Sequence, residues 1–198
     1  MASTLKINNL DTASGTEITI PTGKKLVVTD TGGVKLPGGI VQVVRSIVNN
    51  PSSTQTSSTS YIAVNSAPEV SITPKFAGSL IMIYCGGPIA HFNVSSNYGP
   101  VYNIGRTIAG GSVAMVDTTG PLHGVFKNNQ TAGHWEDHVV NYQFCDAPSY
   151  SLGQALTYRM YGRKTTSGSD TWLNHHGGIG STGAGSTSLY TVCMEIAQ

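Results

Sequence analysis

Charged residues are scarce in this chain. Asp, Glu, Lys and Arg together make up 11% of its 198 residues, and the formal net charge is +1. A protein that binds a phosphate backbone or an anionic membrane surface needs a dense positive patch, and this sequence has too few cations to build one. We therefore expect no nucleic-acid partner.

Long apolar runs are also missing. The longest, Leu80 to Cys85, is far shorter than the roughly 20 residues with which a helix crosses a bilayer. The N-terminus lacks the charged start and apolar stretch of a secretory signal. We expect a chain that carries no signal peptide and is not inserted in a membrane.

Cysteine is rare and dispersed. Cys85, Cys145 and Cys193 each lie in an apolar, strand-like run, not in a closely spaced cluster. Isolated cysteines of this kind usually behave as small buried apolar residues. Disulfide frameworks and zinc sites need cysteines in pairs at characteristic spacings. We expect three buried free thiols.

Helical periodicity is almost absent, because Gly or Pro interrupts every stretch with three- and four-residue apolar spacing. The sequence instead predicts an all-β chain of eight or nine short strands with turn residues between them, as in a β-sandwich or jelly roll. The expected strands cover residues 40–45, 61–64, 69–73, 80–85, 91–94, 101–107, 138–146, 154–164 and 189–196.

Two of these strands carry a distinct pattern. Both alternating sets of Leu80–Cys85 are apolar, which predicts a strand in the middle of a sheet with both faces covered. The last strand alternates apolar residues with Thr191, Cys193 and Glu195. We expect the apolar set to face the core, namely Tyr190, Val192, Met194 and Ile196.

The first 38 residues differ from the rest. They hold few bulky apolar residues between Thr, Asn, Asp and Gly, so this segment cannot bury itself. An isolated two-stranded ribbon is marginal in water, and open strand edges pair with other chains. We divide the chain into an arm, residues 1–38, and a head, residues 39–198. The arm should pair or dock through its bulkiest residues, Ile18, Ile20, Leu26, Val27 and Val28.

Long irregular segments at 109–137 and 165–188, and a Ser/Thr-rich stretch at 49–60, are predicted as loops. Loops of such length are usually functional or ordered by a neighbour. Aromatic rings and imidazoles in or beside them are candidate contacts to a glycan or a partner protein, and alternatively the tryptophans hold the loops to their own domain. These candidates are Tyr98, Tyr102, Trp135, Trp172, His175 and His176, with Tyr150 nearby.

Two motifs suggest chemistry, but neither has the required context. His134 and His138 flank two carboxylates, as zinc ligands do on a helix, yet Gly133 and a β-branched pair indicate a loop entering a strand. Gly178–Gly183 matches a dinucleotide fingerprint without a strand before it or a helix after it. The neighbouring His175 and His176 lack an alternating His-x-His spacing, although a trimer could bring several such imidazoles together near its axis. We predict no catalytic residues, cofactor or metal.

Several patches resemble virion proteins of tailed bacteriophages, especially marine and cyanobacterial ones. They include Pro21-Thr22-Gly23-Lys24-Lys25-Leu26 and lie at residues 1–7, 16–28, 39–44, 59–61, 70–75, 80–83 and 190–198. The resemblance implies a homotrimer with intertwined or docked arms, made in the host cytoplasm and built into the virion beside other virion proteins.

Two functions fit this resemblance. In the first, the head is the receptor-binding part of a tail fibre that grips a host surface glycan or protein. In the second, the chain is a trimeric capsid decoration protein that clamps neighbouring capsomers. A third class, an enzyme that cuts host wall polymers, has no signature or β-helix repeat here.

Overall fold

The part of the chain that the structure describes contains twelve strands and no helix. The computed structural model describes residues 22–24, 27–28, 34–49, 54–65, 67–93, 100–119, 123–124, 134–164, 171–174 and 188–198, with the backbone alone at 55, 88–93, 123–124, 134–140 and 171–174. The predicted all-β class is confirmed.

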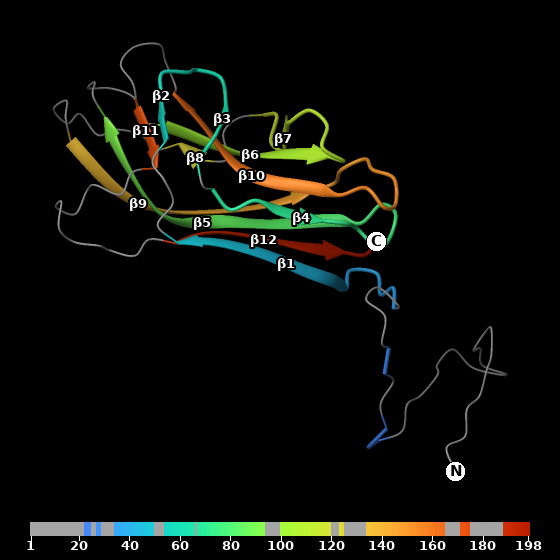
Figure 1. Cartoon of the computed structure of the whole chain (residues 1–198). Helices are drawn as coiled ribbons and strands as arrows, with labels where there is room; N and C mark the ends of the chain where they lie inside the picture. The colour runs from blue at the N-terminus through green and yellow to red at the C-terminus, as the bar shows by residue number, and fades with distance from the viewer. Residues whose placement is uncertain are drawn as a thin grey trace.

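The strands form two antiparallel sheets (Figure 1). In the first sheet β5 is the central strand. Strands β12 and β11 pair with one edge of β5, and β9 pairs with the other edge. Strand β1 then pairs with β12, and β2 pairs with β11. Its strands are β1 (Ile40–Asn49), β2 (Thr54–Thr56), β5 (Leu80–Asn93), β9 (His134–Asp146), β11 (Thr171–Asn174) and β12 (Ser188–Ile196).

The second sheet is built on β10 and β6, which pair along their whole length from Leu156↔Ile108 to Lys164↔Pro100. The short strands β3 and β4 add to β10, and β7 and β8 add to β6. Its strands are β3 (Ile62–Ala63), β4 (Val70–Ile72), β6 (Pro100–Ile108), β7 (Ala114–Met115), β8 (His123–Gly124) and β10 (Leu156–Lys164).

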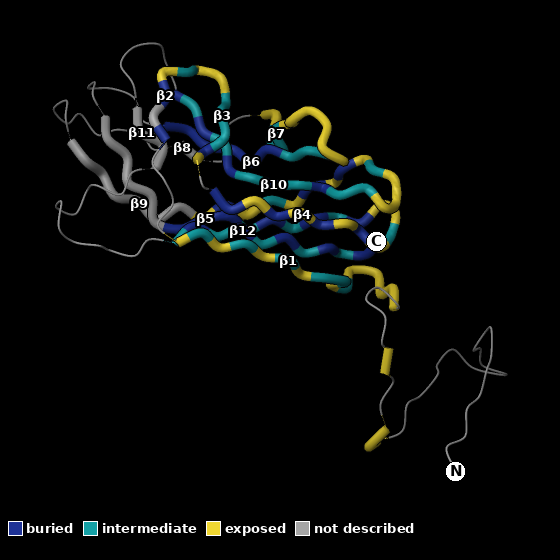
Figure 2. The backbone as a smooth tube through the Cα atoms, viewed as in Figure 1, coloured by how far each residue is buried: buried dark blue, intermediate teal, exposed yellow. Residues whose placement is uncertain are grey.

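The core lies between the two sheets (Figure 2). Ile81, Ile83 and Leu189 of the first sheet and Leu156 and Met160 of the second are almost completely buried. The head is therefore a β-sandwich, as predicted. Its first and last strands pair with each other, so the entry to the head lies beside the C-terminus.

Strand β5 is longer than the sequence predicts. We expected separate strands at 80–85 and 91–94, because Gly86-Gly87-Pro88 has the composition of a turn. The ladder with β9 instead runs unbroken from Ile81↔Asp146 to Asn93↔His134. Gly87 has φ 135°, and a Cβ there would lie 2.4 Å from the Ser188 carbonyl oxygen, so this glycine permits β12 to approach.

Several segments expected to be loops contribute strands. Residues 54–56 form β2, where Thr54 and Thr56 are buried, although 49–60 was expected to be exposed. The two long insertions contain β7, β8, β11 and the beginning of β9. The polar composition of these segments predicted loops. Short strands at a sheet edge can nevertheless form, because backbone pairing holds them and they need few apolar side chains.

The last strand faces the opposite way from our expectation. Leu189, Thr191, Cys193 and Glu195 are buried, whereas the alternate set of Tyr190, Val192, Met194 and Ile196 is only half-buried. The register with β5 decides this, because Cys193 pairs with Ile83 and Glu195 with Ile81, both inward-facing. The expectation that both faces of Leu80–Cys85 are covered is also wrong within the described residues, since Leu80, Met82 and Tyr84 share this half-buried outer side.

The carboxylate of Glu195 is fully buried and is satisfied by hydrogen bonds from a turn and a neighbouring strand. Its oxygens accept from the backbone N–H groups of Lys75 at 2.9 and 3.0 Å and Phe76 at 3.1 Å, and from the Ser79 hydroxyl at 2.8 Å. Gln42 of β1 donates its side-chain amide at 2.7 Å. A buried charge is tolerated only when it is hydrogen-bonded in this way, so Glu195 ties the 73–79 turn and β1 to the last strand.

We expect Glu195→Gln to lower the free energy of unfolding by roughly 2 to 3 kcal/mol, because the amide keeps the shape but places an N–H₂ group against N–H donors. Denaturant unfolding measures the effect. Glu69→Gln removes an exposed carboxylate and should change the free energy by less than about 0.5 kcal/mol. Equal stability of the two variants would show that the buried network contributes nothing.

Candidate functional site

Within the described residues, no group of three or more His, Cys, Asp and Glu side chains is placed to hold a metal ion. The same residues contain no helix that is long and apolar enough to span a bilayer. His134 and His138 lie on β9 in backbone only, and residues 175–183 lie outside the described part.

One cluster of ionisable groups joins the two sheets. Arg106 of β6 donates from Nη1 to both carboxylate oxygens of Asp146 at 2.7 and 2.6 Å, and the Tyr158 hydroxyl donates to Oδ2 at 2.8 Å. Burial, with the Asp146 charge beside it, raises the pKa of Tyr158, so the phenol keeps its proton. Tyr158 has no exposed surface, and Asp146 is 6% exposed. The cluster therefore braces β9 against β6 and β10, with Tyr158 and Asp146 buried and Arg106 partly exposed.

Tyr102 is not a receptor contact, contrary to our expectation. Its side chain has no exposed surface, lies on the inner face of β6 and has its ring centroid 6.2 Å from that of Tyr142. Burial raises its pKa. Tyr150 is also engaged, because its hydroxyl donates to the Phe76 carbonyl at 2.7 Å and accepts from the Ser79 N–H at 3.0 Å.

The remaining receptor candidates are placed only in part. The backbone of Trp135 lies on β9 opposite Phe92, and that of Trp172 lies on β11 opposite Gln55, so both are strand residues and not loop residues. Their side chains, and all of Tyr98, His175 and His176, lie outside the described residues. Their contact with a receptor stays a prediction.

The arm enters the head at a defined point. The Gly38 N–H donates to the Ala197 carbonyl at 2.8 Å, and the Ala197 N–H donates to the Gly39 carbonyl at 3.0 Å. Gly38 has φ 75°, a left-handed conformation that favours glycine. The Lys35 ammonium lies 5.8 Å from the centroid of the Phe76 ring. These contacts hold the arm beside the C-terminus (Figure 1).

Apolar arm residues near this point are exposed to solvent. Val27 is 73% exposed and Val28 is 43% exposed, while Ile18, Ile20 and Leu26 lie outside the described residues. Val34 at 41% and Leu36 at 63% continue the exposed apolar series toward β1. Our sequence analysis did not single out these last two residues.

A second apolar surface, which the sequence analysis missed, covers the side of the first sheet that faces away from the core. We call it the outer face and define it on β1, β12, β5 and β9. Its rows follow the registers of the four strands. They are Ile40–Ile196–Leu80, Val43–Met194–Met82–Cys145, Arg45–Val192–Tyr84–Gln143 and Ile47–Tyr190–Gly86–Asn141.

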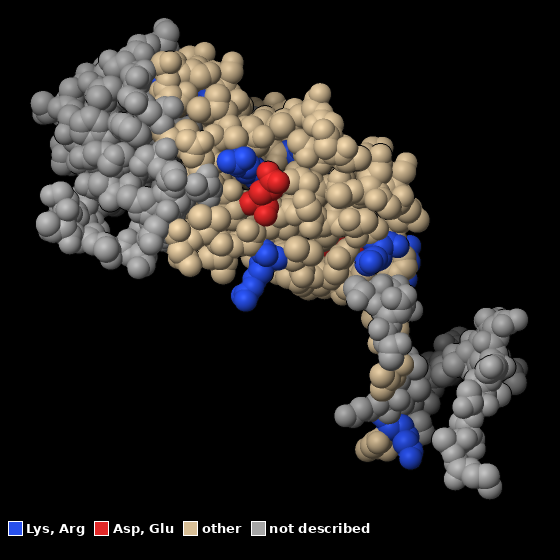
Figure 3. Space-filling view, in the orientation of Figure 1, with Lys and Arg blue, Asp and Glu red and all other residues tan. Residues whose placement is uncertain are grey.

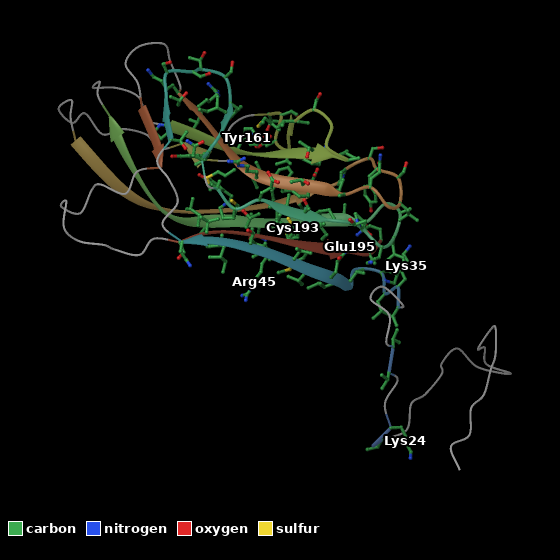
Figure 4. The ribbon with its side chains drawn as sticks, in the orientation of Figure 1. Lys24, Lys35, Arg45, Tyr161, Cys193 and Glu195 are labelled. Carbon is green, nitrogen blue, oxygen red and sulfur yellow. The ribbon has the colours of Figure 1, made fainter. Side chains whose placement is uncertain are left out.

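The outer face has a single charge among its described positions. This is Arg45, which extends away from the sandwich beneath β1 (Figure 4). The view in Figure 3 shows how sparse charged side chains are over the described part of the head. Polar side chains lie toward one end and one edge, where Ser188 donates to Asn49 at 2.6 Å and Tyr190 donates to Asn141.

The three cysteines divide into two kinds. Cys85 and Cys193 are buried, as predicted, and Cys85 lies 3.3 Å from the Thr191 hydroxyl. Cys145 is exposed on the outer face, contrary to our expectation, because its strand presents residues 141, 143 and 145 outward. Burial raises the pKa of Cys85 to about 11 and that of Cys193 to about 12.

The described residues thus define an antiparallel two-sheet β-sandwich. No family model and no curated protein matches the sequence. Among solved structures, it aligns with chains from two structures of infectious bursal disease virus. The Gx strain chain shares 13% identity over 78% of this chain at a TM-score of 0.35, and the Gt strain chain shares 12% over 87% at 0.35. These weak structural neighbours are viral, and this chain spans 40% and 45% of their lengths.

We expect the two buried thiols to resist modification in the folded protein. In a Cys145→Ser variant at pH 8, a thiol reagent should modify neither Cys85 nor Cys193, because each pKa lies well above that pH and each group is enclosed. In denaturant both should react. Rapid modification of either thiol before unfolding would contradict the described core.

Proposed function

We propose that the chain is a structural protein of a viral particle, with a β-sandwich head carried on an N-terminal arm. The observation that carries the proposal is the exposed apolar series of the arm, which includes Val27 at 73% and Leu36 at 63%. Apolar surface gains about 25 cal/mol per Å² when it leaves water, so these side chains favour a partner. Assembly is the function that such a segment serves.

The particle that we propose is a tailed bacteriophage, on the basis of the sequence patches that resemble its virion proteins. The chain serves there as a tail-fibre or receptor-binding component. The arm pairs with two sister arms in a homotrimer or docks on other virion proteins, and the head presents its loops to a host glycan or protein. We propose no enzymatic role and no bound cofactor.

A trimeric capsid decoration protein is the second candidate. The exposed apolar residues of the arm also fit this candidate, because an arm that lies on capsomer surfaces would bury them there. The number of copies in purified particles distinguishes the two functions. Hundreds of copies would identify a decoration protein, whereas tens or fewer would identify a tail component.

We expect a Val27→Asp, Val28→Asp double variant to be lost from virions, because two charges in the arm oppose its burial on a partner. The measurement is quantitative mass spectrometry of particles purified after the variant gene replaces the natural one. Leu152→Asp is the matched control, since Leu152 is an apolar residue of the head with 59% exposure. It should be incorporated normally.

Loss of at least tenfold in the arm variant, with normal levels of the control, is the expected result. Normal incorporation of the arm variant would contradict the role that we assign to the arm. Absence of the natural chain from purified particles would contradict the viral assignment itself.

A further inference from the structure

The outer face is not covered by any described part of the chain. Val43 is 55% exposed, Ile47 is 52% exposed and Ile40 is 61% exposed, all on β1. Their cross-strand neighbours on β12 and β5 are half-buried, as expected for residues shielded only by the side chains beside them. Antiparallel sheets that face water normally carry polar residues on that side, so this apolar side indicates a missing partner.

The distribution of residue types on this face matches that of protein interfaces. Its centre contains Val43, Met194, Met82, Val192 and Tyr84, which lie together across three paired strands. Interface centres are rich in methionine and aromatic residues and poor in charge, and they are surrounded by a polar rim. Here the rim lies at the far edge and one end of the sheet, with Asn141 and Gln143 on β9 and Asn49 and Ser188 where β1 meets β12.

The face provides most of the area that a stable contact needs. Four strands about 4.8 Å apart, each about nine residues long at about 3.3 Å per residue, cover roughly 600 Å² in plan before the relief of the side chains is added. A stable interface of standard size buries roughly 800 Å² per partner.

The scarcity of charge on the outer face favours another copy of this chain as its partner. A surface with the single charge of Arg45 and no acidic residue among its described positions has nothing with which to select a charged partner. The same face on another copy is equally apolar, and it supplies neutral acceptors for Arg45 through the Gln143 and Asn141 amides. Arg45 lies on β1 and these amides lie on β9, so one part of the face complements another part on a second copy, as in the head-to-tail contacts of cyclic homo-oligomers.

We propose that the outer face of β1, β12, β5 and β9 packs against the outer faces of two other copies of this chain. In a homotrimer, three such faces surround the three-fold axis, with Val43, Met194 and Met82 turned inward. This contact is made by the heads and adds to the contacts proposed for the arm. It is independent of the viral assignment.

The first test is the mass of the full chain in solution at about 10 µM, measured by light scattering. The natural chain should form an oligomer, about 62 kDa for a trimer of 20.7 kDa chains. A Val43→Asp, Ile47→Asp variant should be monomeric, because each copy would bury two unpaired carboxylates. Leu152→Asp, the same change on an exposed apolar residue outside this face, should retain the natural mass.

The second test uses Cys145, which lies in the same row as Val43, separated from it by Met194 and Met82. In the natural oligomer, a bulky maleimide should modify Cys145 at least tenfold more slowly than in the Val43→Asp, Ile47→Asp variant. The variant should expose one thiol per chain and keep Cys85 and Cys193 unreactive, which verifies that its head is folded.

Three results would overturn the inference: a monomeric natural chain, a double variant of natural mass, or equal Cys145 reactivity in both. Any of these results would still be compatible with the proposed function, provided that the Val27→Asp, Val28→Asp variant is lost from virions. Conversely, a monomeric face variant from a chain that is absent from virions would support the head contact and refute the viral role.

Discussion

The structure depends on the register between the last strand and β5. This register pairs Glu195 with Ile81 and Cys193 with Ile83, and so turns a carboxylate, a thiol and a hydroxyl toward the core. A shift by one residue would exchange the two faces of β12. The register is held because Glu195 finds its donors in the 73–79 turn and on β1, whereas Met194 or Ile196 in that position would leave those N–H groups without an acceptor.

The same register creates the surfaces that need a partner. With the polar set of β12 inside, Tyr190, Val192, Met194 and Ile196 are displaced outward, next to Val43 and Ile47 of β1. The arm continues this apolar series through Leu36 and Val34. The described ionisable cluster of Arg106, Asp146 and Tyr158 links the two sheets. The described part of the chain therefore presents apolar contact surfaces, which support the assembly role that we propose.

Local patterns were sufficient to predict the all-β class, the sandwich, and most long strands, because alternation and turn residues are properties of neighbouring residues. They could not predict which side of a strand faces the core when the buried side carries Glu195, since its partners lie more than 100 residues away in the sequence. The same limit explains Cys145 and Tyr102, whose exposure depends on pairing with β5 and β10. Gly86-Gly87-Pro88 has turn composition, but pairing with β9 keeps it extended.

The orientation of β12, with Glu195 inside the sandwich and the apolar set outside, determines both the buried network and the apolar outer face. Nuclear Overhauser contacts from the Lys75 and Phe76 amide protons to the side chain on β12 test it most directly. We expect strong contacts to the Glu195 methylene protons and none to Met194. Contacts from these amides to the side chains of Met194 or Ile196, with Glu195 free in solvent, would contradict it.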